Sequence, residues 1–219
     1  MSLQLFAHPF SSYCQKVLIA MYENGTDVEL RMLGPDHPQN FTEFAQQWPI
    51  RRMPVLLDDG KPVIESSIII EYLQWRHPGT VRLIPQDPAA ALDVRFMDRF
   101  FDLYVMTPLG TIVFDSLRPA DQRDPHGVVH VRALLDTSYQ WLDERMKSRQ
   151  WAAGDAFSLA DCGAAPFLFY ADWTHRIPDS LTHVHAYRRR LLARPSVVRA
   201  VDEARPFRHL FPLGAPDRD

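Results

Sequence analysis

Two serines and a cysteine stand close together near the start of the chain, as Ser11, Ser12 and Cys14. Residues 3–7 alternate in polarity as a short strand does, and an apolar helical stripe begins at Val17. The serines are therefore expected in a turn between a strand and a helix. A helix N-terminus has unpaired N–H groups and a partial positive charge, so a hydroxyl there can help to hold an anion such as a thiolate. A simpler role, capping the helix, is equally open from this turn alone.

The composition restricts the classes of protein that the chain can represent. Its 219 residues are 46% hydrophobic, enough for one large domain or two modest ones, and the net charge is only −3. A general nucleic-acid binder needs a basic surface, so that class is not expected. The first ten residues lack an export signal, and no segment reaches the roughly 20 apolar residues of a membrane span. We expect a soluble, cytoplasmic protein that binds neither nucleic acid nor membranes.

The cysteines and histidines form no recognised disulfide or metal pattern. Cys14 and Cys162 are the two cysteines, and neither has a partner at Cys-x-x-Cys spacing, so reduced thiols are expected. Nine histidines are present, but the nearest approaches to a ligand set, within 126–130 and 183–185, lack a third ligand at a recognised spacing. No metal is expected.

Residues 1–78 predict a small α/β domain. The order is strand, helix, strand, helix, strand, strand, helix, with strands at 3–7, 27–33, 53–57 and 61–64 and a closing helix at 66–75. The last two strands form a hairpin, because Asp58-Asp59-Gly60 between them is a tight polar turn. A βαβ unit followed by a hairpin and a helix is the order of the thioredoxin-like fold.

The rest of the chain predicts a second, all-helical domain. Pro78-Gly79 ends the closing helix, 79–87 has the character of a linker, and the helical domain occupies 88–219. Its first helix is expected from Ala89 to about Leu117, with an interruption at 108–110. The apolar stripe assigned to that helix consists of Leu92, Phe96, Phe100, Leu103 and Tyr104.

A helix-start signal lies at 157–162. Ser158 at the N-cap can bond the backbone N–H of Asp161, Asp161 can reach back, and Phe157 can pack on Cys162. Such a cap contributes about 1 kcal/mol. The pattern favours a structural role for Asp161 over a catalytic one, and burial of Cys162 over nucleophilic chemistry.

Ser11-Ser12-Tyr13-Cys14 resembles the Cys-Pro-Tyr-Cys turn of glutaredoxins with the first cysteine replaced by serine. The whole opening is similar to that of a cytosolic glutathione transferase of a serine-using, theta- or zeta-like bacterial type. The cap at 158–161 matches the capping box that this family has at the start of its buried helix. The resemblance covers the whole chain and implies an α/β thioredoxin-like N-terminal domain, an all-α helical-bundle C-terminal domain, and glutathione as co-substrate.

The resemblance also assigns roles to single residues. Ser11 matches the serine that donates a hydrogen bond to the glutathione sulfur. Pro54 matches the family's cis-proline, which exposes the backbone of Val55 to the cysteinyl part of glutathione. Glu65-Ser66 matches the pair that binds the γ-glutamyl end, where a helix N-terminus suits a carboxylate and Glu65 can pair with an ammonium.

One sequence segment near the predicted glutathione site departs from the family pattern. The segment 48–52 reads Trp-Pro-Ile-Arg-Arg, where the family usually has Asn-Pro-x-Gly-Lys. Arg52 replaces the usual lysine and is expected at the glycyl carboxylate, although a solvated position for both arginines is equally open. The remaining predicted glutathione contacts are His37, Gln39, Arg52 and Met53. Some classes activate the thiol with a tyrosine, but the place of Tyr13 inside the turn favours packing.

In this family the electrophile pocket lies against the first helix of the helical domain. The predicted lining is Phe10, Arg95, Phe96, Arg99, Asp102, Leu103, Met106 and Phe207. Phe207, with Phe211, would come from the tail and form the roof of the cleft. Arginine mixed with Phe and Met would suit an apolar substrate with an acidic group.

Two functions of different classes remain open at this point. In the first, a detoxifying enzyme ionises the glutathione thiol, which attacks an electrophile or serves as a peroxide reductant. In the second, the same fold is a binding or assembly module without turnover. The set Ser11, Pro54, Val55, Glu65 and Ser66 favours the enzyme. The resemblance further implies a two-fold symmetric homodimer.

Overall fold

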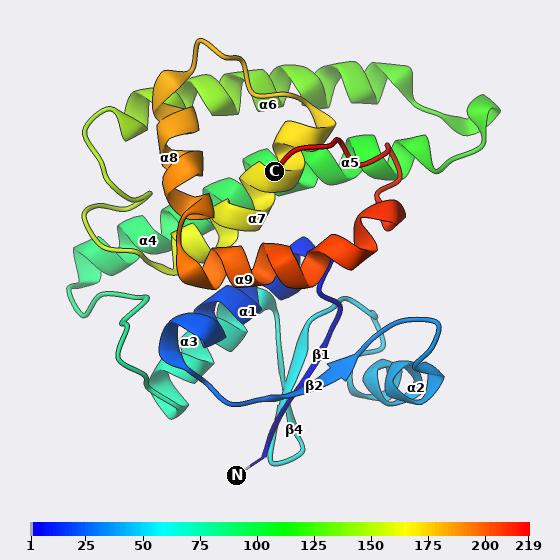
Figure 1. Cartoon of the computed structure of the whole chain (residues 1–219), viewed down its shortest axis with the longest axis vertical. Coiled ribbons are helices and arrows are strands. Elements are labelled where there is room, and N and C mark those ends of the chain that lie inside the picture. Colours follow the sequence, from blue (N-terminus) through cyan, green and yellow to red (C-terminus); the bar gives the residue numbers. More distant parts are fainter. Residues whose placement is uncertain (1) are drawn as a thin grey trace.

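Alternation along the strands divides the core of the N-terminal domain into two parts. In the computed structural model, which describes residues 2–219, Leu5 and Ala7 face one side of the sheet and Phe6 faces the other. The elements of this domain are β1 (Leu3–Ala7), α1 (Ser12–Asn24), β2 (Glu29–Met32), α2 (Pro38–Gln47), β3 (Val55–Asp58), β4 (Lys61–Ile64) and α3 (Ser66–Arg76). Helices α1 and α3 cover the Leu5 face, and α2 covers the Phe6 face (Figure 1).

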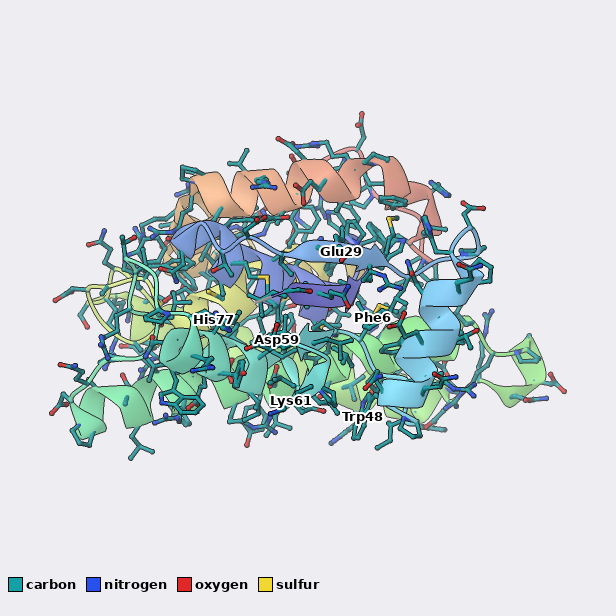
Figure 2. All side chains as sticks on the ribbon, turned by 90° about the horizontal axis from the view of Figure 1, so that it is seen from below. Phe6, Glu29, Trp48, Asp59, Lys61 and His77 are labelled. Carbon is teal, nitrogen blue, oxygen red and sulfur yellow. The ribbon has the colours of Figure 1, made fainter. Side chains whose placement is uncertain are left out.

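The sheet has the order β2-β1-β3-β4. β1 runs parallel to β2, with Leu5 opposite Leu30, and antiparallel to β3, with Leu5 opposite Leu56. The tight turn at 59–60 joins β3 to β4 as a hairpin. On the Phe6 face a small core of Phe6, Leu33, Phe44, Val55 and Leu57 holds α2 against the sheet, and Figure 2 shows Phe6 and Trp48 beside that helix.

The second domain is helical, with α7 at its centre (Figure 1). Its elements are α4 (Pro88–Phe100), a π-helical turn η1 (Phe101–Met106), α5 (Thr107–Ser116), a 3-10 turn η2 (Ala120–Gln122), α6 (Pro125–Met146), α7 (Leu159–Thr174), α8 (Thr182–Leu192), α9 (Pro195–Ala204) and a 3-10 segment η3 (Arg205–Leu210). Every residue of α7 is buried, and α7 packs along α1 of the first domain. The predicted fold class, thioredoxin-like followed by all-helical, is confirmed.

The capping box at the start of α7 is present as predicted. Asp161 is fully buried, and its Oδ2 accepts from the Ser158 N–H (2.9 Å) and hydroxyl (2.8 Å). Its Oδ1 accepts from the Ala152 N–H (2.9 Å) and the Tyr187 hydroxyl (2.6 Å). Both oxygens of this carboxylate therefore hold the helix start in place, and these four hydrogen bonds lie within the helical domain.

The first helix of this domain differs from the prediction in two ways. The expected break at 108–110 is absent, because the wide π turn before Pro108 accommodates the proline ring and the helix continues to Ser116. The predicted apolar stripe is wrong except for Phe100. Its other members, Leu92, Phe96, Leu103 and Tyr104, are exposed. The buried face consists of Ala91, Val94, Met97, Asp98, Phe100, Phe101, Asp102 and Val105.

Among residues 2–219 we find no helix with the length and apolar character needed to cross a membrane.

Candidate active site

Ser11 lies at the junction of the β1–α1 turn and the helix. Its backbone is extended (φ −80°, ψ 123°), and its side chain makes no capping hydrogen bond to α1. The Ser11 N–H donates to the His8 carbonyl (3.0 Å), and the Gln15 N–H donates to the Ser11 carbonyl (2.9 Å). The backbone is thus fixed on both sides, while the half-buried hydroxyl does not cap the helix. This geometry disfavours the simple capping role.

The two neighbours of Ser11 that could do chemistry are engaged or buried. The Ser12 hydroxyl is buried and donates to the sulfur of Met106 (3.4 Å). Cys14 has no solvent exposure, and burial raises the pKa of its thiol to about 11, although hydrogen bonds with the Ser11 side chain and the His8 backbone act in the opposite direction. A thiol that is neutral and inaccessible is a poor nucleophile.

Tyr13 packs into the helical domain rather than into a catalytic position. Its ring meets Phe167 of α7 edge-on, with 5.0 Å between ring centroids. Burial, and then the negative charge of Asp102, raise the pKa of the Tyr13 phenol far above its ordinary value. A tyrosinate is therefore disfavoured here at neutral pH, in agreement with the expected packing role.

A cavity of about 760 Å³ opens beside Ser11, which is within the usual size range of ligand pockets. Its walls come from the β1–α1 turn, the β2–α2 connection with the start of α2, the residue before Pro54, and the tail. The lining residues are His8, Phe10, Ser11, Leu33, Gly34, Pro35, Pro38, Phe41, Thr42, Met53 and Leu210. We call this cavity the cleft. It brings together Ser11, Phe10 and Met53 of the predicted site, and most of its other walls are apolar.

His8 and Leu210 are cleft residues that the sequence analysis did not single out. The Nδ1 atom of His8 accepts a hydrogen bond from the Phe10 N–H (3.1 Å), and its ring meets Phe207 edge-on at 4.7 Å. Burial lowers the pKa of His8, which favours the neutral imidazole at pH 7. Their positions in the sequence are a usable signal: His8 directly follows the predicted strand at 3–7, and Leu210 lies between Phe207 and Phe211.

The predicted glutathione residues at β3 and α3 adopt distinctive backbone conformations. The Met53–Pro54 peptide bond is cis, and Val55 directly afterwards begins β3. Glu65 has φ 74°, a left-handed conformation that is uncommon for a residue other than glycine and that clusters at functional sites. Its side chain is exposed and does not cap α3, whereas Ser66, the first residue of that helix, is buried.

Several predicted glutathione residues lie outside the cleft lining, among them Pro54, Val55, Glu65 and Ser66. His37, Gln39 and Arg52 are exposed and do not line the cleft either. The neighbouring Arg51 has φ 58°, and its guanidinium lies 5.9 Å from the ring centre of Phe41, a cleft residue. At the point where the sequence departs from the family pattern, Arg51 rather than Arg52 therefore contacts the cleft wall.

The predicted electrophile-pocket residues separate into two groups. Phe10 lines the cleft, Phe207 contacts His8, and Met106 contacts Ser12. Phe207 and Met106 do not themselves line the cleft, and the remaining predicted residues do not either: Arg95, Phe96, Arg99, Asp102 and Leu103. The helical period explains the difference, because 94, 97 and 98 form the buried face of α4 and turn 95 and 96 outward.

Arg95 and Phe96 have partners on that outer face. Arg95 forms a two-point ion pair with Glu71 of α3, with both N–O distances 2.8 Å. The Phe96 ring lies edge-on to Trp141 of α6 at 5.9 Å between centroids. These contacts occupy the arginine that would have attracted an acidic substrate group.

A buried ion cluster is centred on Lys16 of α1, five residues after Ser11. The Nζ atom of Lys16, a residue with no solvent exposure, is 2.6 Å from Asp98 Oδ1 and 3.6 Å from Asp102 Oδ1. It also donates to the Ser67 hydroxyl (2.9 Å), which in turn donates to Asp98 Oδ2 (2.6 Å). Asp102 is further paired with Arg99 at 3.2 Å. The cluster ties α1 and α3 to the first helix of the helical domain.

Within residues 2–219 we find no group of three or more His, Cys, Asp or Glu side chains that could hold a metal ion.

Comparisons with known proteins agree with this architecture. The sequence profile of the glutathione S-transferase N-terminal domain matches residues 5–81, and that of the C-terminal domain matches residues 105–195. A protein from Nicotiana tabacum named "Probable glutathione S-transferase" is 28% identical over 163 residues, covering 74% of this chain and 68% of that protein. A stringent starvation protein A homolog from Coxiella burnetii is 24% identical over 204 residues, covering 92% of both.

A solved structure is similar over nearly the whole length. It is a glutathione S-transferase from Methylobacillus flagellatus with glutathione bound, 26% identical, with a TM-score of 0.81 over 91% of this chain and 98% of that one. The chain belongs to the glutathione S-transferase family.

The ion cluster gives the first testable prediction. Replacing Lys16 by Met leaves Asp98 and Asp102 buried without their cation, which should lower the free energy of unfolding by about 3–5 kcal/mol. The matched control is Arg95→Met, which breaks a half-exposed pair and should cost under about 1 kcal/mol. Urea unfolding followed by circular dichroism measures both; equal losses in the two variants would contradict a buried, paired Lys16.

Proposed function

We propose that the protein is a glutathione transferase that binds glutathione in the cleft and keeps its thiol ionised with Ser11. The observation that carries this proposal is the position of Ser11. Its hydroxyl stands at the N-terminus of α1, forms part of the cleft wall, and does not cap the helix. A hydroxyl and a helix N-terminus at one point both favour a negative charge there. The glutathione bound in the similar Methylobacillus structure supports the choice of thiol.

The free energy needed to ionise the glutathione thiol is within the range that Ser11 and the N-terminus of α1 can supply. A free thiol ionises near pH 8.5, so most of it is neutral at pH 7. Lowering that pKa by about two units requires roughly 2.7 kcal/mol of preference for the thiolate. One hydrogen bond to an anion contributes about 1.5–3 kcal/mol, and a helix N-terminus adds up to about 1 kcal/mol. Ser11 and the N-terminus of α1 together can therefore lower the pKa of the thiol by about two units.

The walls of the cleft indicate the class of the second substrate. Phe10, Leu33, Phe41, Met53 and Leu210 make it largely apolar, which suits an apolar electrophile. An acidic group on that substrate finds little support, because Arg95 is paired with Glu71 and Arg99 with Asp102. An organic hydroperoxide also fits an apolar cleft, so peroxide reduction by the thiolate is a second activity to assay. We place the protein in the cytoplasm, in detoxification.

Retention on immobilised glutathione, followed by an assay with chlorodinitrobenzene and one with cumene hydroperoxide, tests the function. We expect retention and turnover of at least one of the two. One similar protein has a name other than transferase, and a module without turnover is the alternative. Binding without turnover of either substrate would favour that module, and neither binding nor turnover would refute a glutathione-dependent role.

The Ser11→Ala variant tests the proposed role of the Ser11 hydroxyl in ionising the thiol. Loss of the hydroxyl should raise the apparent pKa seen in the pH dependence of kcat and lower kcat at pH 6.5 at least ~tenfold. Ser12→Ala is the control, because the Ser12 hydroxyl is buried and donates to Met106, so its loss should change these quantities little. Cys14→Ala should also have a small effect, because the buried thiol is neutral at this pH. A pH profile unchanged in Ser11→Ala would assign thiol activation to another group.

Ser66 should act in binding rather than in chemistry. The γ-glutamyl end of glutathione is far from the sulfur, so its contacts are equally strong in the ground and transition states. Ser66→Ala should therefore raise the KM for glutathione with kcat nearly unchanged, at a cost of about 1–3 kcal/mol in kcat/KM. Steady-state kinetics against glutathione separate the two constants. A loss of kcat at constant KM would show that the roles are assigned incorrectly.

A two-fold symmetric homodimer is part of the proposal. The outward side of α3, α4 and α6 carries exposed apolar side chains, namely Ile68, Trp75, Leu92, Phe96 and Trp141. Exposed large apolar side chains such as these are typical of a protein interface, and a symmetric contact closes on itself. Light scattering at micromolar concentration should give twice the chain mass of 25.3 kDa. Phe96→Glu should shift the mass toward that of one chain, and a wild-type protein at 25.3 kDa would exclude the dimer.

A further inference from the structure

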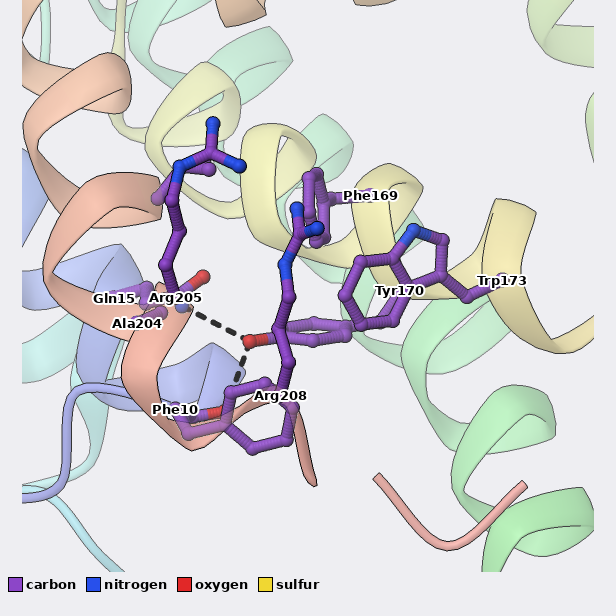
Figure 3. A pocket seen from close by; sticks show the side chains of 9 residues that line it. Phe10, Gln15, Phe169, Tyr170, Trp173, Ala204, Arg205 and Arg208 are labelled. Carbon is purple, nitrogen blue, oxygen red and sulfur yellow. Dashed lines mark hydrogen bonds between the residues drawn. The ribbon is translucent and has the colours of Figure 1, made fainter. Parts of the chain in front are cut away.

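The turn that presents Ser11 has carbonyl groups that belong to neither the strand nor the helix. Such groups need other partners when they are buried. The Tyr170 hydroxyl of α7 donates to the Phe10 carbonyl (3.0 Å). The Gln15 side-chain amide of α1 donates to the Pro9 carbonyl (2.8 Å) and to the Tyr170 hydroxyl (3.0 Å). Figure 3 shows the links of Tyr170 to Gln15 and to Phe10. Two buried side chains thus hold two consecutive carbonyls directly before Ser11.

We call the side chains of Gln15 and Tyr170, with their hydrogen bonds to the Pro9 and Phe10 carbonyls, the clamp. Packing holds both side chains in place. Gln15 and Tyr170 are 3% and 4% exposed. The Tyr170 ring lies edge-on to Phe10 (5.4 Å between centroids) and to Trp173 (5.5 Å), and it is stacked on Phe211 at 6.2 Å. Burial raises the pKa of the Tyr170 phenol far above neutrality, so the hydroxyl remains a donor. The ring therefore has little freedom to follow the turn if the turn moves.

We propose that Gln15 and Tyr170 are positioning residues that set the place of the Ser11 hydroxyl relative to the bound sulfur. This inference rests on the proposed function of Ser11. Because Tyr170 belongs to the helical domain, the clamp makes the geometry of the thiol site depend on how α7 is seated against α1. The same hydrogen bonds fix the backbone of Phe10, whose side chain is a wall of the cleft.

Tyr170→Phe is the decisive variant, since it keeps the ring contacts and removes only the hydroxyl. Misplacement of Ser11 should lower kcat at pH 6.5 about tenfold and raise the apparent pKa of the bound glutathione thiol, with the KM for glutathione changed less than about twofold. Gln15→Met removes both amide donors at similar size and should act in the same direction. A residue with only a structural role would lower stability without moving the thiol pKa.

Tyr139→Phe is the matched control. Its hydroxyl also donates from a fully buried ring to a backbone carbonyl, that of His175 at 3.1 Å, away from the catalytic turn. The Tyr139→Phe substitution should lower the temperature of thermal unfolding but leave the thiol pKa and kcat unchanged. The inference would be overturned if Tyr170→Phe and Tyr139→Phe had the same kinetic effects, or if neither Tyr170→Phe nor Gln15→Met moved the thiol pKa.

A second readout does not depend on glutathione. In the Ser11→Cys, Cys14→Ala background, the pH dependence of iodoacetamide alkylation gives the pKa of the introduced thiol at the helix start. Adding Tyr170→Phe should raise that pKa, and adding Tyr139→Phe should not. If the wild-type protein bound no glutathione, the proposed function would fail, while this titration would still decide whether the clamp positions residue 11.

Discussion

The paired charge of Lys16 is the constraint on which the rest of the site depends. A buried ammonium is tolerated only with nearby anions and hydrogen-bond acceptors, and here they come from two other helices, through Ser67 of α3 and Asp98 of α4. The helix that follows Ser11 therefore cannot move away from the helix that begins at Ser66 without breaking the Lys16–Ser67 hydrogen bond. It cannot move away from the helical domain without separating the Lys16–Asp98 ion pair. The two helix starts that we propose to contact the sulfur and the γ-glutamyl end of glutathione are thereby held at a fixed separation.

Helix α7 completes this arrangement from the other side. Its start is secured by the fully buried Asp161, and its middle packs along the side chain of Lys16, whose stem lies 3.5 Å from where a Cβ at Gly163 would be. About two turns further along, the Tyr170 hydroxyl donates to the carbonyl of Phe10, directly before Ser11. A helix that contributes no residue to the cleft walls thus supports both the charge cluster and the turn before Ser11.

The sequence was informative where structure is decided locally. Strand alternation, the strand-to-helix turn at Ser11 and the capping box at Ser158 depend on residues within a few positions of each other, and the structure has all three. The predicted stripe on the first helix is wrong because it assigns the largest apolar residues to the buried face. In the structure α4 packs against α7, and its buried face carries Val94 and Asp98. Likewise, lysine is rarely buried, so nothing in the local sequence marked Lys16, and the tail residue Leu210 reaches the cleft only through the tertiary fold.

The central claim is that glutathione is bound as a thiolate beside Ser11. The most direct measurement is the thiolate absorbance near 240 nm of the wild-type protein with glutathione, followed as a function of pH. A midpoint about two units below the value of roughly 8.5 for a free thiol is the result that the structure predicts. A midpoint equal to that of free glutathione, in a complex shown by equilibrium dialysis to be saturated, would contradict it.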